Sequence, residues 1–306
     1  MNRQTTSQLL MVRPVRFAFN EQTAANNAFQ QRAADDEAAL RTQQEAIREF
    51  DAYVRLLREA GVGIDVVQDV PEPPTPDSSF PNNCFSTHDE EGGRTLILYP
   101  MFAHNRRLER EKLLPRLNEM LFQRIIDLTH YEQQGLYLEG TGSLVLDREH
   151  RIAYACRSPR TSERVLADWA RQLDYSYLLF DCCDEADMPI YHTNVVMHVG
   201  RRQAVVCLES IRDASQRETV KQSLRESGKE VVGISLAQMH HFAGNMLEVR
   251  NTAGQPLLVM SQAAHQSLAP EQLRLLERET RILAPHLSAI ETAGGGSARC
   301  MLAEIY

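Results

Sequence analysis

The sequence has no long hydrophobic run. Although 43% of its 306 residues are hydrophobic, no stretch reaches the roughly 20 apolar residues that a membrane-spanning helix needs. The polar segment 1–8 also lacks the apolar stretch that is typical of a signal peptide. We therefore expect a soluble cytoplasmic protein with no membrane partner.

The sequence also has no excess of positive charge and no histidine or cysteine spacing that is typical of a metal site. The net charge is −8, from 33 basic and 41 acidic residues, which argues against a broad nucleic-acid-binding surface. The only local histidine pair is His240-His241. The six cysteines show neither disulfide-framework spacing nor a CxxC pair; they are Cys84, Cys156, Cys182, Cys183, Cys207 and Cys300. We expect reduced thiols, no metal and no cofactor.

What the chain does contain is a repeated order of elements. Four times, a hairpin of two short apolar strands is followed by a helix and a third strand. The hairpins are expected at 84–87 with 95–99, 143–146 with 152–156, 195–199 with 204–208, and 246–250 with 256–260. The helices are expected at 107–123, 161–173, 213–226 and 270–283, and the third strands at 124–128, 177–180, 230–234 and 287–290.

A fifth unit can be assembled only from the two ends of the chain. Residues 301–305 would pair with 9–13, followed by a helix over 32–60 and a strand over 64–67. The residues just before the five first strands lie 59, 52, 51 and 55 positions apart; they are Asn83, Gly142, Asn194, Asn245 and Cys300. Such regular spacing is typical of stacked or radial repeats. We predict one α/β domain over residues 1–306, built as a closed five-unit ring; an ordinary mixed α/β domain is the alternative.

In a ring of this kind, equivalent loops face one central site. The five loops span 77–83, 139–142, 192–194, 240–245 and 294–300. They would bring together two carboxylates, Asp77 and Glu139, with His192, several amides and Cys300. Each residue alone has a plain structural explanation, such as a turn cap or a core histidine, but their equivalent positions indicate a catalytic centre. Arg299 directly precedes the sulfur, and a nearby cation favours thiolate over thiol.

These loops resemble those of the guanidino-group-modifying superfamily, whose fold is the pentein, a five-bladed β/α propeller. The resemblance runs nearly end to end and is closest to the arginine-deiminase-related branch assigned to citrulline hydrolysis. It is carried by MVRPVRFAFNEQTAANNAFQ at 11–30, PNNCFSTH at 81–88, LEGTGSLVLD at 138–147, SPRTSERVL at 158–166, HTNVVMHVG at 192–200, FAGNMLEVR at 242–250 and GGGSARCMLAEI at 294–305.

The resemblance implies a cysteine hydrolase acting on a C–N bond of an arginine-like amino acid. Cys300 would attack the ureido or guanidino carbon and form a covalent intermediate, because a thiolate is a better nucleophile than water. His192 would protonate the leaving nitrogen and then activate water, with Glu139 favouring the protonated imidazole. Asp77 resembles the carboxylate that grips the N–H edge of the substrate. Arg160 resembles the arginine that binds its α-carboxylate; an exposed charge near a helix start is the alternative for Arg160.

One position departs from the arginine deiminases, which carry an aspartate where this chain has Asn194. A neutral amide can donate a hydrogen bond to a carbonyl oxygen. Asn194 therefore favours a neutral ureido substrate, and we expect citrulline to be hydrolysed to ornithine, ammonia and carbon dioxide. Asn83 and Asn245 complete the expected substrate-binding set. The segment 17–27 is expected either to close over the substrate or to be a fixed surface loop.

Other functions stay open at this point. Arginine deiminase, dimethylarginine dimethylaminohydrolase and amidinotransferase are alternatives within the superfamily, and a transferase would need an acceptor site that the sequence does not show. A non-catalytic binding protein on the same fold fits less well with Cys300, His192 and Glu139. A papain-like protease would have its cysteine first in the chain. The expected partner is a small amino-acid substrate; the oligomeric state is open, with a homodimer as one option.

Overall fold

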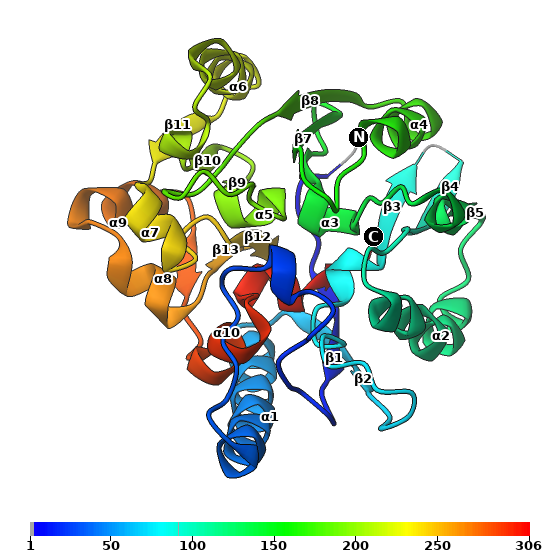
Figure 1. Cartoon of the computed structure of the whole chain (residues 1–306). Coiled ribbons are helices and arrows are strands. Elements are labelled where there is room, and N and C mark those ends of the chain that lie inside the picture. Colours follow the sequence, from blue (N-terminus) through cyan, green and yellow to red (C-terminus); the bar gives the residue numbers. More distant parts are fainter. Residues whose placement is uncertain (1–2, 91) are drawn as a thin grey trace.

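The computed structural model describes residues 3–90 and 92–306. The first two residues of the polar amino-terminal segment and Glu91, in the first predicted hairpin turn, lie outside the described residues. The described strands form five three-stranded sheets in an α/β fold. Figure 1 shows the sheets distributed around the middle of the molecule, with the longer helices on the outside.

All five sheets share one topology, in which the first two strands are antiparallel and the second and third are parallel. Their strands, in spatial order, are β15 (Ala303–Glu304), β1 (Gln8–Arg13) and β2 (Gly63–Gln68); β3 (Phe85–Glu90), β4 (Gly93–Leu98) and β5 (Arg124–Asp127); β6 (Val145–Asp147), β7 (Ile152–Cys156) and β8 (Ser176–Phe180); β9 (Met197–Val199), β10 (Gln203–Val206) and β11 (Glu230–Gly233); and β12 (Leu247–Arg250), β13 (Pro256–Val259) and β14 (Arg281–Leu283). The repeated unit predicted from the sequence is therefore present.

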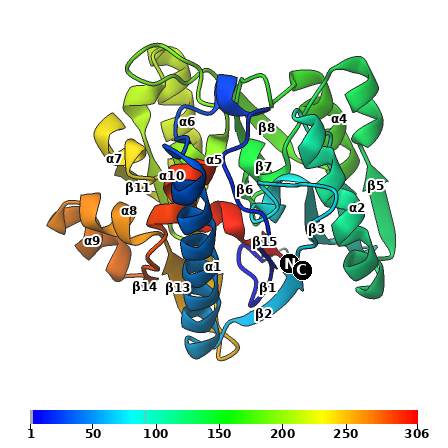
Figure 2. The same cartoon turned by 60° about the horizontal axis from the view of Figure 1, so that its bottom comes forward.

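The two ends of the chain meet in one sheet, as predicted. Strand β15 runs antiparallel to β1, with Leu9 opposite Glu304 and Leu10 opposite Ala303. The backbone N–H of Ile305 donates to the Gln8 carbonyl at 2.9 Å and continues the pairing. Figure 2 shows β15 next to β1.

Each parallel connection passes through one or two outer helices. These are α1 (Asp36–Glu59), α2 (His104–Glu119), α4 (Glu163–Leu173), α6 (Ala214–Glu226), and the pair α8 (Gln262–Ser267) and α9 (Pro270–Glu277). Helix α4 shows why they pack against the sheets: Val165, Trp169 and Leu173 are four residues apart and are all buried. Spacing of this kind places apolar side chains on one face of a helix.

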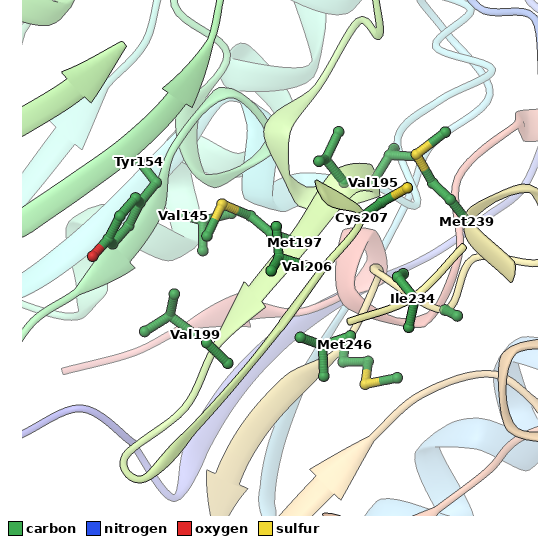
Figure 3. Close-up of a cluster of buried hydrophobic side chains, with 14 of the residues drawn as sticks. Val145, Tyr154, Val195, Met197, Val199, Val206, Cys207, Ile234, Met239 and Met246 are labelled. Atoms are coloured by element: carbon green, nitrogen blue, oxygen red, sulfur yellow. The ribbon is translucent and has the colours of Figure 1, made fainter. Parts of the chain in front are cut away.

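Four clusters of buried apolar side chains lie between the sheets. The cluster in Figure 3 joins the β6, β9 and β12 sheets and includes Tyr154, Val206 and Met246. The other three join the β3 sheet to the β6 sheet, the β1 sheet to the β3 sheet, and the β12 sheet to the β1 sheet. Each sheet thus shares apolar packing with at least two others.

The prediction was wrong in the last unit. The helix expected over 270–283 ends at Glu277, and β14 occupies the end of that range beside β13. The strand expected over 287–290 is the start of helix α10 (Ser288–Gly294). The Glu49 carboxylate of α1 accepts hydrogen bonds from the backbone N–H of Ala289 at 2.9 Å and of Ile290 at 3.0 Å. These amides of the first helical turn need a partner outside the helix, and a short apolar run alone does not distinguish helix from strand.

Short helical turns precede most of the first strands. They are η2 (Pro81–Asn83), α3 (Gly140–Ser143), α5 (Thr193–Val196) and η5 (Ala298–Met301), while α7 (Leu236–His240) lies one turn before β12. The first strands consequently begin one or two residues later than predicted. Cys300 therefore lies within a helical turn and not at the start of a strand.

Candidate active site

The short turns bring the predicted residues to one buried region. Glu139 and His192 are the amino-terminal caps of α3 and α5, and Cys300 lies in η5. Helix α3 contacts both η2 and α5, and η2 contacts η5. The residues of this group are each at most 3% exposed; they are Asp77, Glu139, Arg160, His192 and Cys300. Residues from distant parts of the chain are thus enclosed together.

Glu139 and His192 form a direct pair. The distance between His192 Nε2 and Glu139 Oε2 is 2.7 Å, and Arg160 Nη1 lies 3.5 Å from the same oxygen. The other carboxylate oxygen accepts from the Phe102 backbone N–H at 2.9 Å. Burial opposes ionisation of Glu139, but Arg160 and His192 outweigh it and hold the pKa of this carboxyl well below its usual range. An ionised carboxylate only accepts, so Nε2 carries the proton and Nδ1 is left as a base.

The His192 imidazole is neutral at neutral pH. Burial lowers the pKa of His192 to about 4, although its hydrogen bond to Glu139 acts in the opposite direction. The sequence predicted that Glu139 would favour the protonated ring, and it does act that way. Burial and the nearby positive charge of Arg160 together lower the pKa of His192 more than Glu139 raises it. The resting histidine can therefore accept a proton.

Two amides point their N–H groups at the Cys300 sulfur. Asn245 Nδ2 lies 3.2 Å from Sγ and Asn194 Nδ2 lies 3.5 Å from it. Donors in these positions stabilise negative charge on the sulfur. From the sequence, we expected the Asn194 N–H to face a substrate oxygen. In the structure that N–H faces the sulfur, and Asn194 Oδ1 is the atom without a hydrogen-bond partner among the described residues.

Arg299 does not act as predicted. Its Nη1 donates to the Leu302 carbonyl at 2.7 Å and its Nη2 pairs with the Glu304 carboxylate at 2.8 Å. The guanidinium thus turns toward β15, where an acidic partner balances its charge. Its contribution to the site comes from its backbone N–H, which donates to Asn245 Oδ1 at 3.0 Å and fixes the orientation of that amide.

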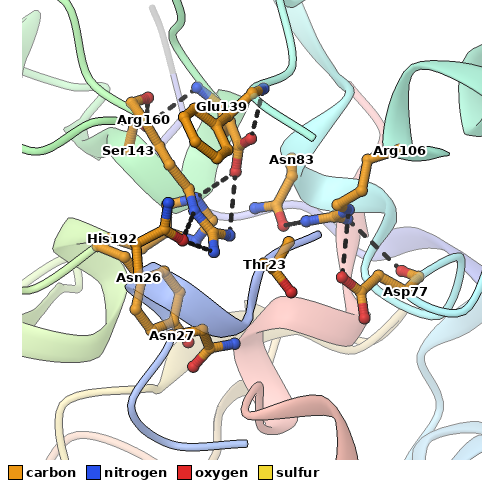
Figure 4. Close-up of polar contacts among 12 residues, drawn as sticks. Thr23, Asn26, Asn27, Asp77, Asn83, Arg106, Glu139, Ser143, Arg160 and His192 are labelled. Carbon is orange, nitrogen blue, oxygen red and sulfur yellow. Dashed lines mark hydrogen bonds and ion pairs between the residues drawn. The ribbon is translucent and has the colours of Figure 1, made fainter. Parts of the chain in front are cut away.

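Arg106 ties Asp77 and Asn83 together, a role that the sequence analysis missed. Its Nη1 donates to Asn83 Oδ1 at 2.8 Å, and its Nε lies 3.8 Å from Asp77 Oδ2 (Figure 4). Glu109 accepts two further hydrogen bonds from the guanidinium, at 2.9 and 3.1 Å. Arg106 is only 2% exposed. The pattern of the surrounding sequence, HNRRLEREK, is nevertheless typical of a charged helix that faces solvent. No local signal separates Arg106 from its charged neighbours.

Several buried polar atoms near these residues are left unsatisfied. Those without a hydrogen-bond partner in the described part of the chain include Asp77 Oδ1, Ser79 Oγ, Asn82 Oδ1, Asn83 Nδ2 and Asn194 Oδ1. Burial raises the pKa of Asp77, although Arg106 acts in the opposite direction. Buried polar groups are normally paired, and each unpaired one costs about 1–3 kcal/mol. Such a group of atoms indicates a place for a polar ligand.

The segment that follows β1 lies over this site. Asn20 Nδ2 donates to Asp77 Oδ2 at 2.7 Å, and Asn26 Oδ1 accepts from Arg160 Nε at 3.0 Å. Asn27 Nδ2 donates to the Gly294 carbonyl at 3.3 Å. Side chains of the segment 17–27, the predicted lid, thus form hydrogen bonds directly with predicted site residues. Closure of this lid on substrate binding stays a prediction.

The described residues show no metal site and no membrane-spanning helix. Within residues 3–90 and 92–306, no group of three or more histidine, cysteine, aspartate or glutamate side chains is placed to hold a metal ion. None of the helices in this part of the chain is long and apolar enough to cross a membrane. All six cysteines are free thiols.

Solved structures share this fold along nearly the whole chain. The substrate-bound N-terminal domain of ArgZ, an arginine dihydrolase of the ornithine–ammonia cycle in cyanobacteria, is 17% identical with a TM-score of 0.73 and 97% coverage of both chains. Unliganded AgrE is 17% identical with a TM-score of 0.74, over 98% of this chain and 39% of that one. A dimethylarginine dimethylaminohydrolase adduct with S-methyl-L-thiocitrulline is 12% identical with a TM-score of 0.65, over 98% and 100%. At these identities the likeness shows the fold.

A family model gives the more specific relationship. No curated protein matches the chain. The model for N,N-dimethylarginine dimethylhydrolase, eukaryotic, matches residues 13–306. Because that match covers nearly the whole chain, the protein belongs to this family of hydrolases, within the guanidino-modifying pentein superfamily.

Proposed function

We propose that the protein is a cysteine-dependent hydrolase that converts citrulline to ornithine, ammonia and carbon dioxide. The choice of a ureido substrate rests on Asn83 Nδ2, a buried N–H donor without a partner among the described residues. Arg106 fixes this amide, because a guanidinium can only donate and Asn83 Oδ1 must therefore face it. The amide nitrogen lies beside His192: a Cβ added at Gly142 would be 2.3 Å from Asn83 Nδ2 and 2.8 Å from His192 Cε1.

The free donor distinguishes a ureido group from a guanidinium. A ureido oxygen can accept from Asn83 Nδ2, whereas a guanidinium has only donors and would leave this N–H unpaired. An unpaired buried donor costs about 1–3 kcal/mol, or roughly five- to 150-fold in specificity. The unpartnered acceptors Asp77 Oδ1 and Asn194 Oδ1 suit the N–H groups of the ureido group.

The first half of the reaction forms a covalent intermediate. The Cys300 sulfur bonds to the ureido carbon while His192 Nδ1 takes the thiol proton. The bond from that carbon to the δ-nitrogen breaks, the nitrogen receives the proton from His192, and ornithine leaves. Cys300 then carries a carbamoyl group. Arg160 is the proposed partner of the substrate α-carboxylate, which suits its planar guanidinium.

The second half releases the enzyme. His192 takes a proton from water as its oxygen attacks the carbamoyl carbon, and the sulfur leaves with a proton from His192. The carbamic acid that forms decomposes to ammonia and carbon dioxide. Glu139 holds the ring through Nε2 in both halves, while Asn194 and Asn245 hold the sulfur.

We also propose that residues 1–306 form one catalytic domain whose five sheets close into a ring. Support comes from the pairing of β15 with β1 and from the apolar clusters, in which each sheet shares packing with at least two others. A single ring would explain why residues from all five units converge on one place.

Hydrolysis of arginine or of N-methylated arginine is the second candidate. The unpartnered acceptors Asp77 Oδ1, Asn82 Oδ1 and Asn194 Oδ1 favour a substrate rich in N–H groups. The similarity to an arginine dihydrolase and the family description point in the same direction. This candidate leaves the Asn83 donor without a partner.

A substrate panel tests the proposal. Purified protein is incubated separately with citrulline, arginine, asymmetric dimethylarginine and agmatine, and the products are identified by mass spectrometry. We expect ornithine from citrulline with the highest kcat/KM. Conversion of arginine or dimethylarginine with citrulline left intact would overturn the substrate assignment. Absence of turnover and of any adduct on Cys300 with all four compounds would favour a non-catalytic protein.

One substitution links the panel to the observation that carries the proposal. Asn83→Asp keeps the side-chain size but replaces the free donor by an acceptor. We expect the ratio of kcat/KM for citrulline over arginine to fall by roughly tenfold or more, from the cost of a mismatched buried hydrogen bond. An unchanged ratio would remove Asn83 as the discriminating residue.

A further inference from the structure

We propose that Asn26 is a specificity-determining residue whose side-chain amide fills the carboxylate-binding edge of Arg160 until a substrate carboxylate displaces it. This proposal rests on the proposed function, because it takes Arg160 as the group that binds the amino-acid end of the substrate. Asn26 is then an internal competitor of the substrate α-carboxylate, and only a substrate that carries this group has to displace it.

The amide oxygen of Asn26 lies in the fork of the guanidinium. Asn26 Oδ1 accepts from Arg160 Nε at 3.0 Å and also from Nη2 (Figure 4). Nε and Nη2 lie on one edge of the group and together form the pair that binds a carboxylate with two parallel hydrogen bonds. The remaining nitrogen, Nη1, lies 3.5 Å from Glu139 Oε2. Asn26 therefore occupies the edge that a substrate carboxylate needs.

Arg160 is held in place, so a substrate has to meet it at this edge. Its side chain is 2% exposed, and its guanidinium lies over the Tyr191 ring with a distance of 4.8 Å to the ring centre. The Tyr191 hydroxyl in turn donates to the Gly295 carbonyl. These contacts fix the plane of the guanidinium. Displacement must then come from movement of Asn26.

Asn26 is placed where it can move. It ends the short turn η1 (Ala24–Asn26), which has no buried residue. A hollow of about 210 Å³ lies beside it, lined by Asn26, Phe29, Pro159, Ile190 and Tyr191 among others. The hollow can receive the Asn26 side chain when it leaves the fork. The rest of the lid segment can keep its contacts, such as that of Asn27 with the Gly294 carbonyl.

The charge of the incoming group decides whether Asn26 leaves. A carboxylate brings a full negative charge and two acceptor oxygens to the guanidinium. It therefore pairs with arginine more strongly than a neutral amide, which offers one oxygen. A substrate with the same ureido group but no carboxylate has nothing to offer Arg160. It does not need the fork, so it leaves Asn26 in place, gains nothing from the charge of Arg160, and binds less tightly than citrulline.

Two substitutions of Asn26 should act in opposite directions. KM and kcat are measured for citrulline and for N-carbamoylputrescine, its counterpart without the carboxylate. Asn26→Ala frees the fork, so the KM for citrulline should fall by about fivefold, the equivalent of one hydrogen bond, with little change in kcat. Asn26→Asp places a competing carboxylate in the fork and should raise this KM by roughly tenfold or more. Neither change should alter the KM for N-carbamoylputrescine by the same factor.

Asn27→Ala is the matched control. It removes a hydrogen bond that anchors the same segment but leaves the Arg160 fork filled. If loosening the lid were the whole effect, Asn27→Ala and Asn26→Ala would shift both substrates equally, and the proposal would fail. A rise in the KM for citrulline in Asn26→Ala would overturn it too, because it would show that Asn26 holds the bound substrate.

A binding measurement separates failure of this proposal from failure of the proposed function. Affinities of ornithine and of putrescine, which lacks the carboxylate, are measured by calorimetry for wild type, Asn26→Ala and Asn26→Asp. Ornithine should bind more tightly to Asn26→Ala and more weakly to Asn26→Asp, even if no ureido compound is hydrolysed. Equal ornithine affinity in all three proteins would overturn the role of Asn26.

Discussion

Replacing Glu139 by glutamine tests the role of His192 as the acid–base group. Glutamine keeps the size of the side chain and can still accept from the Phe102 backbone N–H. It removes the negative charge that lies 2.7 Å from His192 Nε2. In the proposed reaction the imidazole becomes positively charged when it takes the thiol proton, so this charge acts mainly on the reacting state.

The magnitude follows from the change in the hydrogen bond. A bond to a charged partner contributes about 1.5–3 kcal/mol and a neutral one about 0.5–1.5 kcal/mol. The difference of about 1–2 kcal/mol corresponds to a fall in kcat of roughly five- to 30-fold. Glu139 is fully buried, so water does not screen the lost interaction, and we expect a result at the upper end of this range.

The pH dependence of kcat/KM provides a second test of this role. Glu139 raises the pKa of His192, which burial lowers to about 4. Without Glu139 this pKa falls further, so the neutral ring persists to lower pH. Because kcat/KM reports the free enzyme, its acid limb should move to lower pH in Glu139→Gln.

The assay is steady-state release of ammonia from citrulline across acid and neutral pH. Glu109→Gln is the control, because Glu109 is 2% exposed and pairs with Arg106. It should leave the acid limb in place. Thermal denaturation of both variants checks the fold. An unchanged kcat and acid limb in Glu139→Gln, or the same shift in the control, would refute the assigned role of the Glu139–His192 pair.

Three further substitutions test the sulfur and its surroundings. Cys300→Ser should abolish turnover and the covalent adduct seen by intact-mass spectrometry while leaving the melting temperature unchanged; retained activity would rule the nucleophile out. Gly142→Ala places a Cβ 2.8 Å from His192 Cε1 and should lower kcat by about tenfold or more, whereas Gly233→Ala, where nothing lies within 4 Å of the added atom, should not. Equal kcat values would contradict this crowding. Asn194→Asp puts a carboxylate at the position 3.5 Å from the sulfur, so kcat/KM should fall for citrulline and arginine alike; a gain for arginine would show that Asn194 contacts the substrate.

The repeated sheets and the ends of the chain could be predicted because their signals are local. Short apolar strands and the spacing of the residues that precede them predicted the pairing of 301–305 with 9–13, and the structure adds its register, with Leu9 opposite Glu304. The same spacing placed Glu139, His192 and Cys300 at equivalent points. The local pattern failed at helix α10, whose first turn donates two hydrogen bonds to the Glu49 carboxylate, about 240 positions earlier in the chain.

The site residues that were missed depend on neighbours from other units. Arg106 looks like one charge among many in its helix, and only its burial against Asp77 and Asn83 reveals it. The orientation of an amide is likewise invisible in sequence. The N–H of Asn194 faces the sulfur because Cys300 lies there, and its oxygen is left over. The residue types predicted which residues belong to the site. Only the structure shows which amide atom of each side chain donates and which accepts.

The polar groups of the site can be explained by the charges that the proposed proton transfer from Cys300 to His192 creates. Before reaction, burial keeps the His192 ring neutral despite Glu139. When the proton passes from Cys300 to His192, negative charge appears on a sulfur that faces the N–H groups of Asn194 and Asn245. Positive charge appears on a ring already bonded to an ionised carboxylate. The polar groups are therefore oriented toward charges that arise during the reaction. Interactions that strengthen in the transition state raise kcat, whereas equal binding of the resting state does not.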